Sequence, residues 1–331
     1  MAASLDQPLI TVLGASGLLG TAITRELAGR AVRLRLVGRR RSRVPSGSQA
    51  DVEVRTGDLT VTSELAEAVA DADVVIHLVA HITGVATWRV TPGDLRAERV
   101  NLGLVHDLIR VIRAQHRDRP PIVVLAGSMS QAGRSATARI DGSEPDEPVS
   151  EYDRQKLAAE RALEAATAQG WVRGTTLRLA TLFSQGTDPT SLDRGVVASM
   201  TRRALAGEPL TMWHDGTVRR DLLCVDDAAR AFAAAIDHAD ALAGRHWLVG
   251  TGHGTEVGEL FHTIAKAVAE LTGKPPVPVV STPPTAYSSA TDLLDFVLDP
   301  AGFARVSGWA PQVALSEALI RVATAVANES R

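Results

Sequence analysis

Three glycines follow the first apolar segment of the chain, and their spacing restricts the fold more than any other feature. Residues 9–13 are apolar and predict a buried strand, after which glycines stand at positions 14, 17 and 20. At a strand–helix junction the first glycine permits a tight turn, the second lets the backbone approach a pyrophosphate, and the third lets helix and strand pack closely. The helix N-terminus then faces the phosphates with unpaired N–H groups. The motif predicts a nucleotide site, and the alternative is a glycine-rich turn without a ligand. The residues predicted to line the site here are Gly14, Ser16, Gly17, Leu18 and Gly20.

Strand-like and helix-like segments alternate over the first 180 residues. The predicted strands after the first are 32–37, 52–54, 74–79, 122–125 and 175–179, and the predicted helices are 22–28, 63–69, 102–112 and 157–168. Such alternation predicts an α/β fold with a parallel, doubly wound sheet and helices on both faces. Ser63 is the expected N-cap of its helix.

After residue 179 the loops lengthen and prolines become frequent. A strand at 221–225 and a helix at 226–238, with Asp226 as N-cap, still stand out. We therefore expect a nucleotide-binding domain at 1–180, to which 221–246 returns. Residues 181–220 and 247–331 are then expected to form a smaller substrate-binding lobe.

Composition excludes several classes of function. The chain has 331 residues, 45% of them hydrophobic, and a formal net charge of −3, so nothing indicates the concentrated basic face of a nucleic-acid-binding protein. Its single cysteine, Cys224, rules out a disulfide within the chain, predicts no cysteine-based metal site, and lies in an apolar run typical of a core. No apolar stretch has membrane-spanning length and residues 1–8 lack a secretory pattern, so we expect a cytoplasmic protein.

The end of the second predicted strand indicates which cofactor is bound. NAD sites usually place Asp or Glu here to bind the ribose hydroxyls. This chain has Arg39 and Arg40 instead, followed by Arg41. Guanidinium groups suit a 2′-phosphate, so the sequence predicts NADP(H) rather than NAD(H). The alternative is that these arginines form a charged, solvated surface segment without a ligand.

Two further strand ends are predicted to line the cofactor. Asp58, with Leu59, follows the third strand, where its carboxylate can accept from the adenine amino group or serve as a turn or cap residue. The backbone of Leu78, Val79 and Ala80 ends the fourth strand. His77 precedes them and is expected to be a hydrogen-bonded interior histidine rather than a catalytic one.

Tyr152 and Lys156 form the predicted catalytic pair. They are four residues apart and so share one helical face. Reducing a ketone creates an alkoxide that needs a proton, which a phenol can supply. A nearby ammonium favours the phenolate, so Lys156 is expected to lower the pKa of Tyr152. The alternative is a surface Tyr/Lys pair.

A serine after the fifth predicted strand can complete the site. The hydroxyl of Ser128 can hydrogen-bond the substrate carbonyl oxygen and stabilise its developing charge. Ser130 can do the same, and spacing does not choose between them.

These features occur in the order typical of a known family. Two later segments, 220–227 and Gly308–Trp309–Ala310–Pro311, continue this order. Together these features give nearly the whole chain a resemblance to the extended short-chain dehydrogenases/reductases. The resemblance implies a Rossmann-type fold with a smaller C-terminal lobe. It also favours Ser128 over Ser130 as the catalytic serine, because Ser128 stands five residues before a glycine typical of the family, here Gly133.

Three segments, 77–81, 152–161 and 211–221, narrow the resemblance to the dTDP-4-keto-6-deoxyhexose 4-ketoreductases of antibiotic deoxysugar pathways. The implied reaction is NADPH-dependent reduction of the C4 ketone of a dTDP-4-keto-6-deoxyhexose, 2,6-dideoxy in the favoured case. Tyr152 would donate the proton, Ser128 would polarise the carbonyl, and Lys156 would orient the cofactor.

The same resemblance implies the substrate and subunit contacts. Ser130 and Thr181 are expected beside the substrate, and Arg220 at its diphosphate, with an ion pair to a nearby acid as the alternative role of Arg220. A homodimer through the helices near 101–116 and 152–168 is also implied.

Four other activities are possible for a chain with such motifs. A sugar 4,6-dehydratase is rejected, because such enzymes have Thr-Asp-Glu where this chain has Ser128–Met129–Ser130. A nucleotide-sugar epimerase would hold NAD, against which Arg39 and Arg40 argue, and an Asn common after the sixth strand in such relatives is missing. A reductase of a non-sugar ketone, such as a polyketide aglycone, would share every feature before residue 180. Only the lobe after residue 180 distinguishes it from a sugar reductase. A regulator that senses NADP would typically lack the Tyr/Lys pair.

Overall fold

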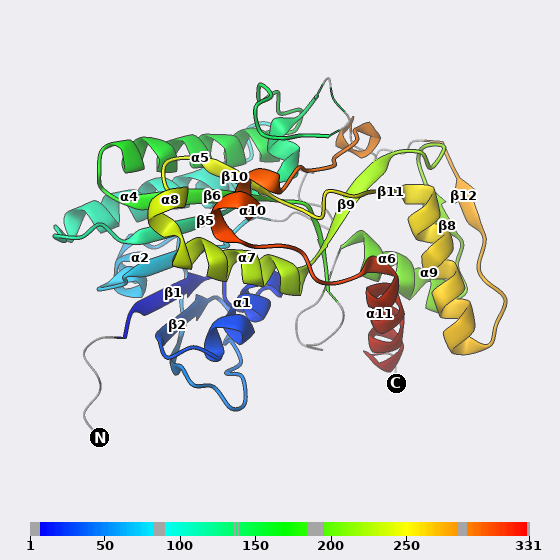
Figure 1. The fold of residues 1–331 in the computed structure, drawn as a ribbon, viewed down its shortest axis with the longest axis horizontal. Coiled ribbons are helices and arrows are strands. Elements are labelled where there is room, and N and C mark those ends of the chain that lie inside the picture. Colours follow the sequence, from blue (N-terminus) through cyan, green and yellow to red (C-terminus); the bar gives the residue numbers. More distant parts are fainter. Residues whose placement is uncertain are drawn as a thin grey trace.

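We analysed a computed structural model of the chain, which describes residues 7–81, 90–135, 137, 139–184, 193, 195–283 and 290–329. A seven-stranded sheet forms its larger part, with strand order β10-β6-β5-β4-β1-β2-β3 (Figure 1). Every neighbouring pair is parallel. The strands are β1 (Leu9–Leu13), β2 (Arg33–Gly38), β3 (Asp51–Thr56), β4 (Val74–His77), β5 (Ile122–Ser128), β6 (Arg173–Leu179) and β10 (His246–Val249).

Helices cover both faces of this sheet, as its almost continuously apolar central strands require. One face packs against α1 (Leu18–Ala28), α7 (Val225–Asp237), α8 (Ala239–Leu242) and α10 (Ala301–Ser307). The other packs against α2 (Thr62–Val69), α4 (Leu104–Ala114) and α5 (Glu151–Ala168). The sheet therefore separates two cores, one containing Phe232 and Phe303 and the other Leu104 and Leu163.

A smaller part of the chain has a third core. It contains a three-stranded sheet of order β11-β9-β7 and a two-stranded sheet of β12 and β8. Helices α6, α9 and α11 surround a cluster that includes Phe183, Phe261 and Leu319. Figure 1 shows these helices on the side of the molecule away from α2 and α4. The bounds are β7 (Thr181–Phe183), α6 (Val196–Leu205), β8 (Leu210–Met212), β9 (Arg219–Cys224), β11 (Gly254–Glu256), α9 (Val257–Thr272), β12 (Val279–Ser281) and α11 (Leu315–Glu329).

Four short elements complete the described chain. They are α3 (Leu95–Glu98), the π-helical turn η2 (Arg99–Gly103), and the 3₁₀ turns η3 (Met129–Ala132) and η4 (Ala290–Leu293). Among the described residues, no helix combines the length and the apolar character needed to cross a membrane.

The predicted fold class is confirmed, and several element boundaries move. The first helix begins at Leu18, directly after the glycine turn, and α5 begins at Glu151, so it includes the predicted Tyr/Lys pair. The strand predicted at 74–79 ends at His77. Cys224 is buried in the third core, as predicted.

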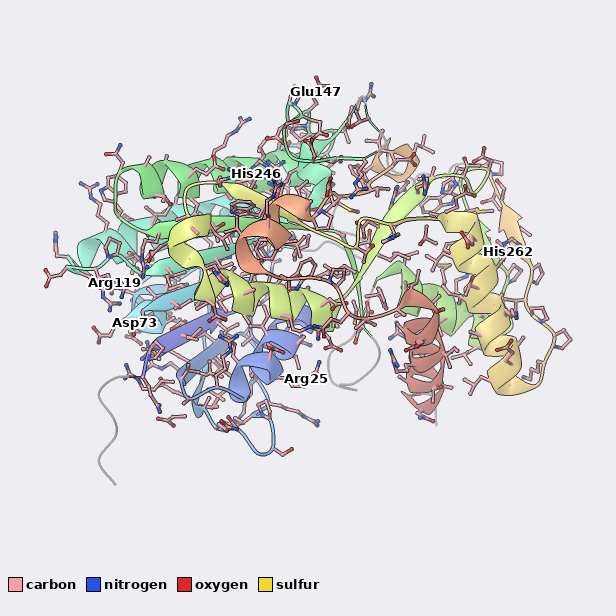
Figure 2. All side chains as sticks on the ribbon, in the orientation of Figure 1. Arg25, Asp73, Arg119, Glu147, His246 and His262 are labelled. Carbon is pink, nitrogen blue, oxygen red and sulfur yellow. The ribbon has the colours of Figure 1, made fainter. Side chains whose placement is uncertain are left out.

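Both predicted N-caps are wrong. Ser63 lies inside α2, whose N-cap is Val61, because the turn that starts at Asp58 runs directly into the helix. Asp226 lies in the first turn of α7, whose N-cap is Cys224, and its carboxylate forms an ion pair with Arg25 of α1. Figure 2 shows Arg25 on the edge of α1 that faces α7.

Segment 221–246 contributes to both parts of the molecule. Its first residues belong to β9 in the three-stranded sheet, whereas α7 packs against α1 beside the large sheet. Its last residue, His246, begins β10, which pairs with β6 and forms an edge of the large sheet.

Candidate active site

The glycine turn has the geometry that its spacing predicts. Gly14 has φ +90°, and a Cβ there would contact Leu78 and Val79 at 3.4 Å, so the turn packs against the chain that leaves β4. A Cβ on Gly20 would lie 2.3 Å from the Gly14 carbonyl oxygen. Only glycine therefore allows α1 to begin this close to β1.

The N-terminus of α1 is suited to bind phosphate. Its N-cap, Gly17, has no side chain to cap the helix, and the first turn contains no acidic residue. The N–H groups of that turn are thus not capped by a side chain, and the helix dipole favours an anion there. These features fit the pyrophosphate of a dinucleotide, which Gly14, Ser16, Gly17 and Leu18 would contact.

The arginines predicted to select the cofactor follow β2 next to this turn. Arg39 and Arg40 are both exposed, and Arg40 donates to the Ser16 carbonyl oxygen at 3.4 Å. A Cβ on Gly38 would lie 3.0 Å from Ser16 Oγ, so the end of β2 and the glycine turn are adjacent. Exposed guanidinium groups therefore lie beside the glycine turn, and their preference for a 2′-phosphate stays a prediction.

Asp58 has the turn role that the sequence left open. Its Oδ1 accepts from the Thr60 amide at 2.9 Å and from the Thr60 hydroxyl at 2.7 Å. These hydrogen bonds, with a smaller effect of Arg39, lower the pKa of its carboxyl. A contact to adenine stays a prediction for Asp58, and Leu59 behind it is buried in the core.

The chain after β4 is held by a residue that sequence reasoning missed. Asn101 of η2 is buried, accepts from the His81 amide at 2.8 Å, and donates to Gln155 of α5 at 2.8 Å. It therefore ties the end of the Leu78–Ala80 segment to the helix of the catalytic pair. In the sequence, the signal for this role of Asn101 was a polar residue at the start of an apolar helical pattern. π-Helical turns such as η2 also often occur at functional sites.

Tyr152 and Lys156 are both buried, at 8% and 4% exposure. Tyr152 packs with Val90 and Ala97, with Ala80 at the edge of the cluster. The Lys156 ammonium donates to the carbonyl oxygen of Ala126 in β5. The alternative of a surface pair therefore does not apply.

The electrostatics of the pair differ from the expectation. Burial, with a smaller contribution from the adjacent Asp153, raises the pKa of Tyr152, so the predicted lowering by Lys156 is wrong for this structure. Burial also lowers the pKa of Lys156 to about 8, against a smaller opposing effect of Glu160. Both shifts have the same cause, because a low-dielectric interior disfavours the charged form of either group. At neutral pH Tyr152 is a phenol and Lys156 is mostly an ammonium.

The predicted substrate residues gather where β5 and β6 end. Ser128 is the last residue of β5, and its Oγ lies 2.7 Å from that of Ser130 in η3. Thr181, the first residue of β7, donates through its hydroxyl to the sulfur of Met129 at 4.0 Å. The fold thus brings Ser128, Ser130 and Thr181 to the edge of the sheet that also carries the glycine turn.

A buried network of polar side chains fixes the backbone of Ser128. The Ser128 amide donates to Gln131 Oε1 at 2.7 Å, and Gln131 donates to Glu160 at 2.9 Å. Glu160 in turn accepts from Arg178 at 2.6 and 3.0 Å. Arg178 and Glu160 side chains are each only 2% exposed, and Arg178 also binds Asp146 through two hydrogen bonds.

His246 joins the same network from β10, where Figure 2 shows it close to α5. Its Nδ1 lies 3.3 Å from Glu160 and 3.9 Å from Glu164. Burial alone would lower the pKa of His246, but hydrogen bonding to the two glutamates outweighs it and raises that pKa to about 9. Burial would raise the pKa of Glu160, yet His246 and Arg178 hold it at about 2.

The carboxylates of Glu160 and Glu164 and the His246 ring lie within 4.8 Å of one another, a spacing also compatible with a metal ion. Arg178 and protonated His246 already supply positive charge here.

Gly133 has a structural reason for its position. Its φ is +68°, and a Cβ would lie 1.7 Å from the carbonyl oxygen of Glu147. Backbone hydrogen bonds join Glu147 to Ala132 and Arg134 on either side of it. This contact sets the distance between the end of η3 and the segment that leads into α5, where Figure 2 shows Glu147.

Arg220 has backbone carbonyl partners in place of the ion pair that was its alternative role. Its Nη atoms donate to the carbonyl oxygens of Arg219, Thr291, Asp292 and Leu294. Its guanidinium also lies over the ring of Phe296 at 5.4 Å. Arg220 therefore anchors segment 291–294, and the expected ion pair with an acid is replaced by carbonyl contacts. Binding of a diphosphate by Arg220 stays a prediction.

His77 is an interior residue, as expected, but it is not hydrogen-bonded. Neither of its ring nitrogens has a partner among the described residues. Burial, with a smaller effect of Lys156, lowers its pKa to about 3, so the ring is neutral.

Comparison with known proteins gives a match to the model of the "NAD dependent epimerase/dehydratase family" over residues 10–250. The dTDP-L-rhamnose 4-epimerase of Burkholderia thailandensis is 24% identical and covers 99% of this chain and 97% of its own. The dTDP-6-deoxy-L-talose 4-dehydrogenase (NAD(P)(+)) of Kitasatospora kifunensis is 25% identical over 96% and 95% of the two chains.

A solved structure has the same fold. The UDP-glucuronic acid 4-epimerase of Bacillus cereus, in complex with UDP-glucuronic acid and NAD, aligns with a TM-score of 0.80 at 19% identity. The alignment covers 97% of this chain and 99% of the epimerase.

The network behind Ser128 predicts a pH-dependent stability. The pKa of His246 is about 9 when folded and about 6.5 when unfolded, so protonation favours the folded state by up to about 3 kcal/mol. This contribution is complete below about pH 6.5 and is lost as pH rises through 9. Replacing His246 with Gln should therefore cost up to about 3 kcal/mol more at pH 6 than at pH 10, measured by urea unfolding.

Replacing His262 with Gln provides a control for this measurement. His262 is an exposed histidine on α9, far from His246 in Figure 2, and its substitution should change the unfolding free energy equally at both pH values. A pH-independent difference between His246→Gln and the unmodified protein would contradict the assignment.

Proposed function

The chain belongs to the NAD dependent epimerase/dehydratase family, and from this premise we propose that it is an NADPH-dependent reductase of the C4 ketone of a dTDP-4-keto-6-deoxyhexose. The observation that carries the proposal is the buried pair of Tyr152 and Lys156, because Lys156 bonds the Ala126 carbonyl of β5, the strand that ends at Ser128. The substrate class is supported by the names of two relatives that match nearly the whole chain, a dTDP-sugar 4-epimerase and a dTDP-sugar 4-dehydrogenase. The favoured substrate is a 2,6-dideoxy sugar of the kind used in antibiotic biosynthesis.

The roles of the catalytic residues follow from their surroundings. When bound, NADPH would supply the hydride that the ketone carbon needs. Tyr152, held as a phenol by burial, donates a proton to the alkoxide oxygen that results. Ser128 hydrogen-bonds the same oxygen and stabilises its charge. Lys156, fixed by the Ala126 carbonyl, would supply positive charge one helical turn from Tyr152 and hold the nicotinamide ribose.

Substrate and cofactor contacts complete the proposal. Ser130 and Thr181 would lie beside the sugar, and Arg220 would contact the diphosphate if its bonds to the 291–294 carbonyls are exchanged. The glycine turn, Asp58, Leu59 and the Leu78–Ala80 backbone would line the cofactor.

A nucleotide-sugar epimerase is the second candidate, because a relative of that name covers 99% of this chain. Such an enzyme would retain NAD and regenerate it in each cycle. The exposed Arg39 and Arg40 argue for the reductase, since a phosphate-selective site suits a cofactor that is consumed. A reductase of an aglycone ketone is the third candidate.

We also propose that the chain forms a homodimer through the helices near 101–116 and 152–168. A surface groove between α4 and α5 is lined largely by apolar groups, including Ile109, Ala162, Ala166 and Trp171. Apolar grooves of this kind are typical of subunit interfaces.

The activity is tested by following NADPH absorbance with a dTDP-4-keto-2,6-dideoxyhexose made in situ. We expect consumption that falls by about 10² or more in Tyr152→Phe, because the proton donor is lost, while the Kd for NADPH stays within about threefold. Near-normal turnover of Tyr152→Phe would refute the assignment. Bound NAD without net consumption would favour the epimerase, and NADPH binding without consumption would direct the search to aglycone ketones.

Cofactor preference is tested by replacing Arg39 and Arg40 together with Ala. The loss of two charge-assisted contacts should lower kcat/KM for NADPH by about tenfold or more and leave kcat/KM for NADH nearly unchanged. Arg43→Ala is the matched control, an exposed arginine three residues beyond Arg40, and should leave both values unchanged. Equal or better use of NADH by the unmodified protein would overturn the preference for NADPH.

The dimer is tested by sedimentation of Ala165→Arg. Ala165 is exposed on α5 in the groove, and a charged side chain there should convert the dimer to a monomer. Ala241→Arg places the same side chain at an exposed alanine of α8, on the opposite face of the sheet, and should leave the dimer intact. A monomeric unmodified protein would contradict the proposal.

A further inference from the structure

One side chain, Ser130, connects the predicted catalytic serine to a buried carboxyl group. Ser128 Oγ lies 2.7 Å from Ser130 Oγ, and Ser130 Oγ lies 2.5 Å from Asp153 Oδ1. Asp153 is fully buried although it directly follows Tyr152 in α5. Its other oxygen, Oδ2, lies 2.5 Å from the hydroxyl of Ser150, the N-cap of the helix. One oxygen of the carboxyl group thus accepts from the N-cap residue of α5, and the other leads toward Ser128.

The protonation state of the carboxyl group decides the direction of this chain of hydrogen bonds. Each serine hydroxyl has one proton to donate, and an ionised carboxylate can only accept. When Asp153 is ionised, Ser130 donates to it and Ser128 donates to Ser130, so Ser128 turns lone pairs toward a ligand. When Asp153 is neutral, its O–H can donate to Ser130 and Ser130 to Ser128. The Ser128 proton is then free for a ligand.

We propose that Asp153 is a positioning residue that sets, through Ser130, the direction in which the Ser128 hydroxyl proton points. The inference rests on the proposed ketone reduction, in which Ser128 must donate to the carbonyl oxygen. When the carboxyl group is neutral, the Ser128 hydroxyl can donate to the ketone oxygen. When it is ionised, Ser128 presents lone pairs to the lone pairs of that oxygen. The chain only reorients hydrogen bonds, so Tyr152 remains the proton donor and no net proton leaves Asp153.

The surroundings of Asp153 make its neutral form accessible. Burial raises the pKa of this carboxyl, although hydrogen bonds from Ser130 and Ser150 and the charge of Arg154 oppose the rise. Tyr152 and Arg154, its neighbours in α5, are the titratable or charged groups next to it in sequence, and η3 contributes no charged side chain.

Charged groups of other elements packed on α5 are engaged elsewhere. Arg99 of η2 binds Asp107, and Arg178 of β6 binds Glu160 and Asp146. None of these acts on Asp153 as a direct partner.

Three substitutions separate the positioning role from the structural one. Asp153→Asn keeps the shape, and its amide can donate to Ser130 while its carbonyl accepts from Ser150, which fixes the chain in the donating direction. Ser130→Ala breaks the chain and leaves the helix cap. Ser150→Ala is the matched control, because it removes an equally short hydrogen bond from the other oxygen of the same carboxyl group.

The first readout is the pH profile of kcat/KM for ketone reduction. In the unmodified protein we expect a fall as pH rises through the pKa of Asp153. Asp153→Asn should abolish that fall and keep the low-pH value until Lys156 loses its charge, at a pKa of about 8. Ser130→Ala should lower the plateau by about tenfold and also abolish the fall. Ser150→Ala should keep the fall and move it to higher pH. A fall that persists unchanged in Asp153→Asn would overturn the proposal.

The second readout needs no turnover and so separates this proposal from the proposed function. Infrared titration can follow the carboxylic acid band that is missing in Asp153→Asn. Because Ser128 and Ser130 stabilise the ionised form along the chain, Ser128→Ala and Ser130→Ala should each raise the pKa of Asp153. A band that titrates identically in both variants and the unmodified protein would overturn the proposal whether or not a ketone is reduced. If the two serine substitutions shift the pKa of Asp153 but the protein reduces no ketone, only the proposed function is refuted.

Discussion

The ion pair between Arg178 and Glu160 fixes the relation between the sheet and the helix on which the candidate site depends. Both side chains are almost completely buried, and a buried charge that loses its partner costs several kcal/mol. The position of α5 over β6 is therefore tightly constrained, and with it the positions of Tyr152 and Lys156. Gln131 extends the constraint to the Ser128 backbone, since it bonds both Glu160 and the Ser128 amide. The predicted catalytic groups are thus positioned by buried electrostatic contacts among Gln131, Glu160 and Arg178.

Parallel strand topology explains why so much of the site was predictable from local patterns. The carboxyl ends of parallel strands meet at one edge of a sheet, and ligands bind where the strand order reverses, here between β1 and β4. Residues that follow predicted strands, such as Gly14, Arg39 and Ser128, therefore had to lie at that edge once the strands were identified. The glycine turn was predictable in detail because its geometry depends on backbone space. The Tyr152/Lys156 spacing was equally informative, since both residues lie in one helix.

Contacts between distant segments were not predictable in this way. Asn101 joins the chain after β4 to α5, and Asp153 joins α5 to η3, yet neither pairing leaves a periodic signal in the sequence. The N-cap predictions failed for a related reason. Ser63 and Asp226 have side chains that suit a cap, but the preceding turns start each helix earlier. The bonds of Arg220 to the carbonyls of residues 291 and 292 likewise join distant segments, and no local pattern in the sequence indicates them.

The burial of Tyr152 bears on the direction of the chemistry. A phenol that donates a proton to an alkoxide must be neutral beforehand, and burial together with the neighbouring Asp153 favours that state. An epimerase of this family must also remove a proton from a sugar hydroxyl, which requires a phenolate in the same buried position. Lys156, whose pKa burial lowers to about 8, is mostly charged at neutral pH and can stabilise that phenolate. Burial of Tyr152 favours the phenol, which is the form that the proposed reduction needs.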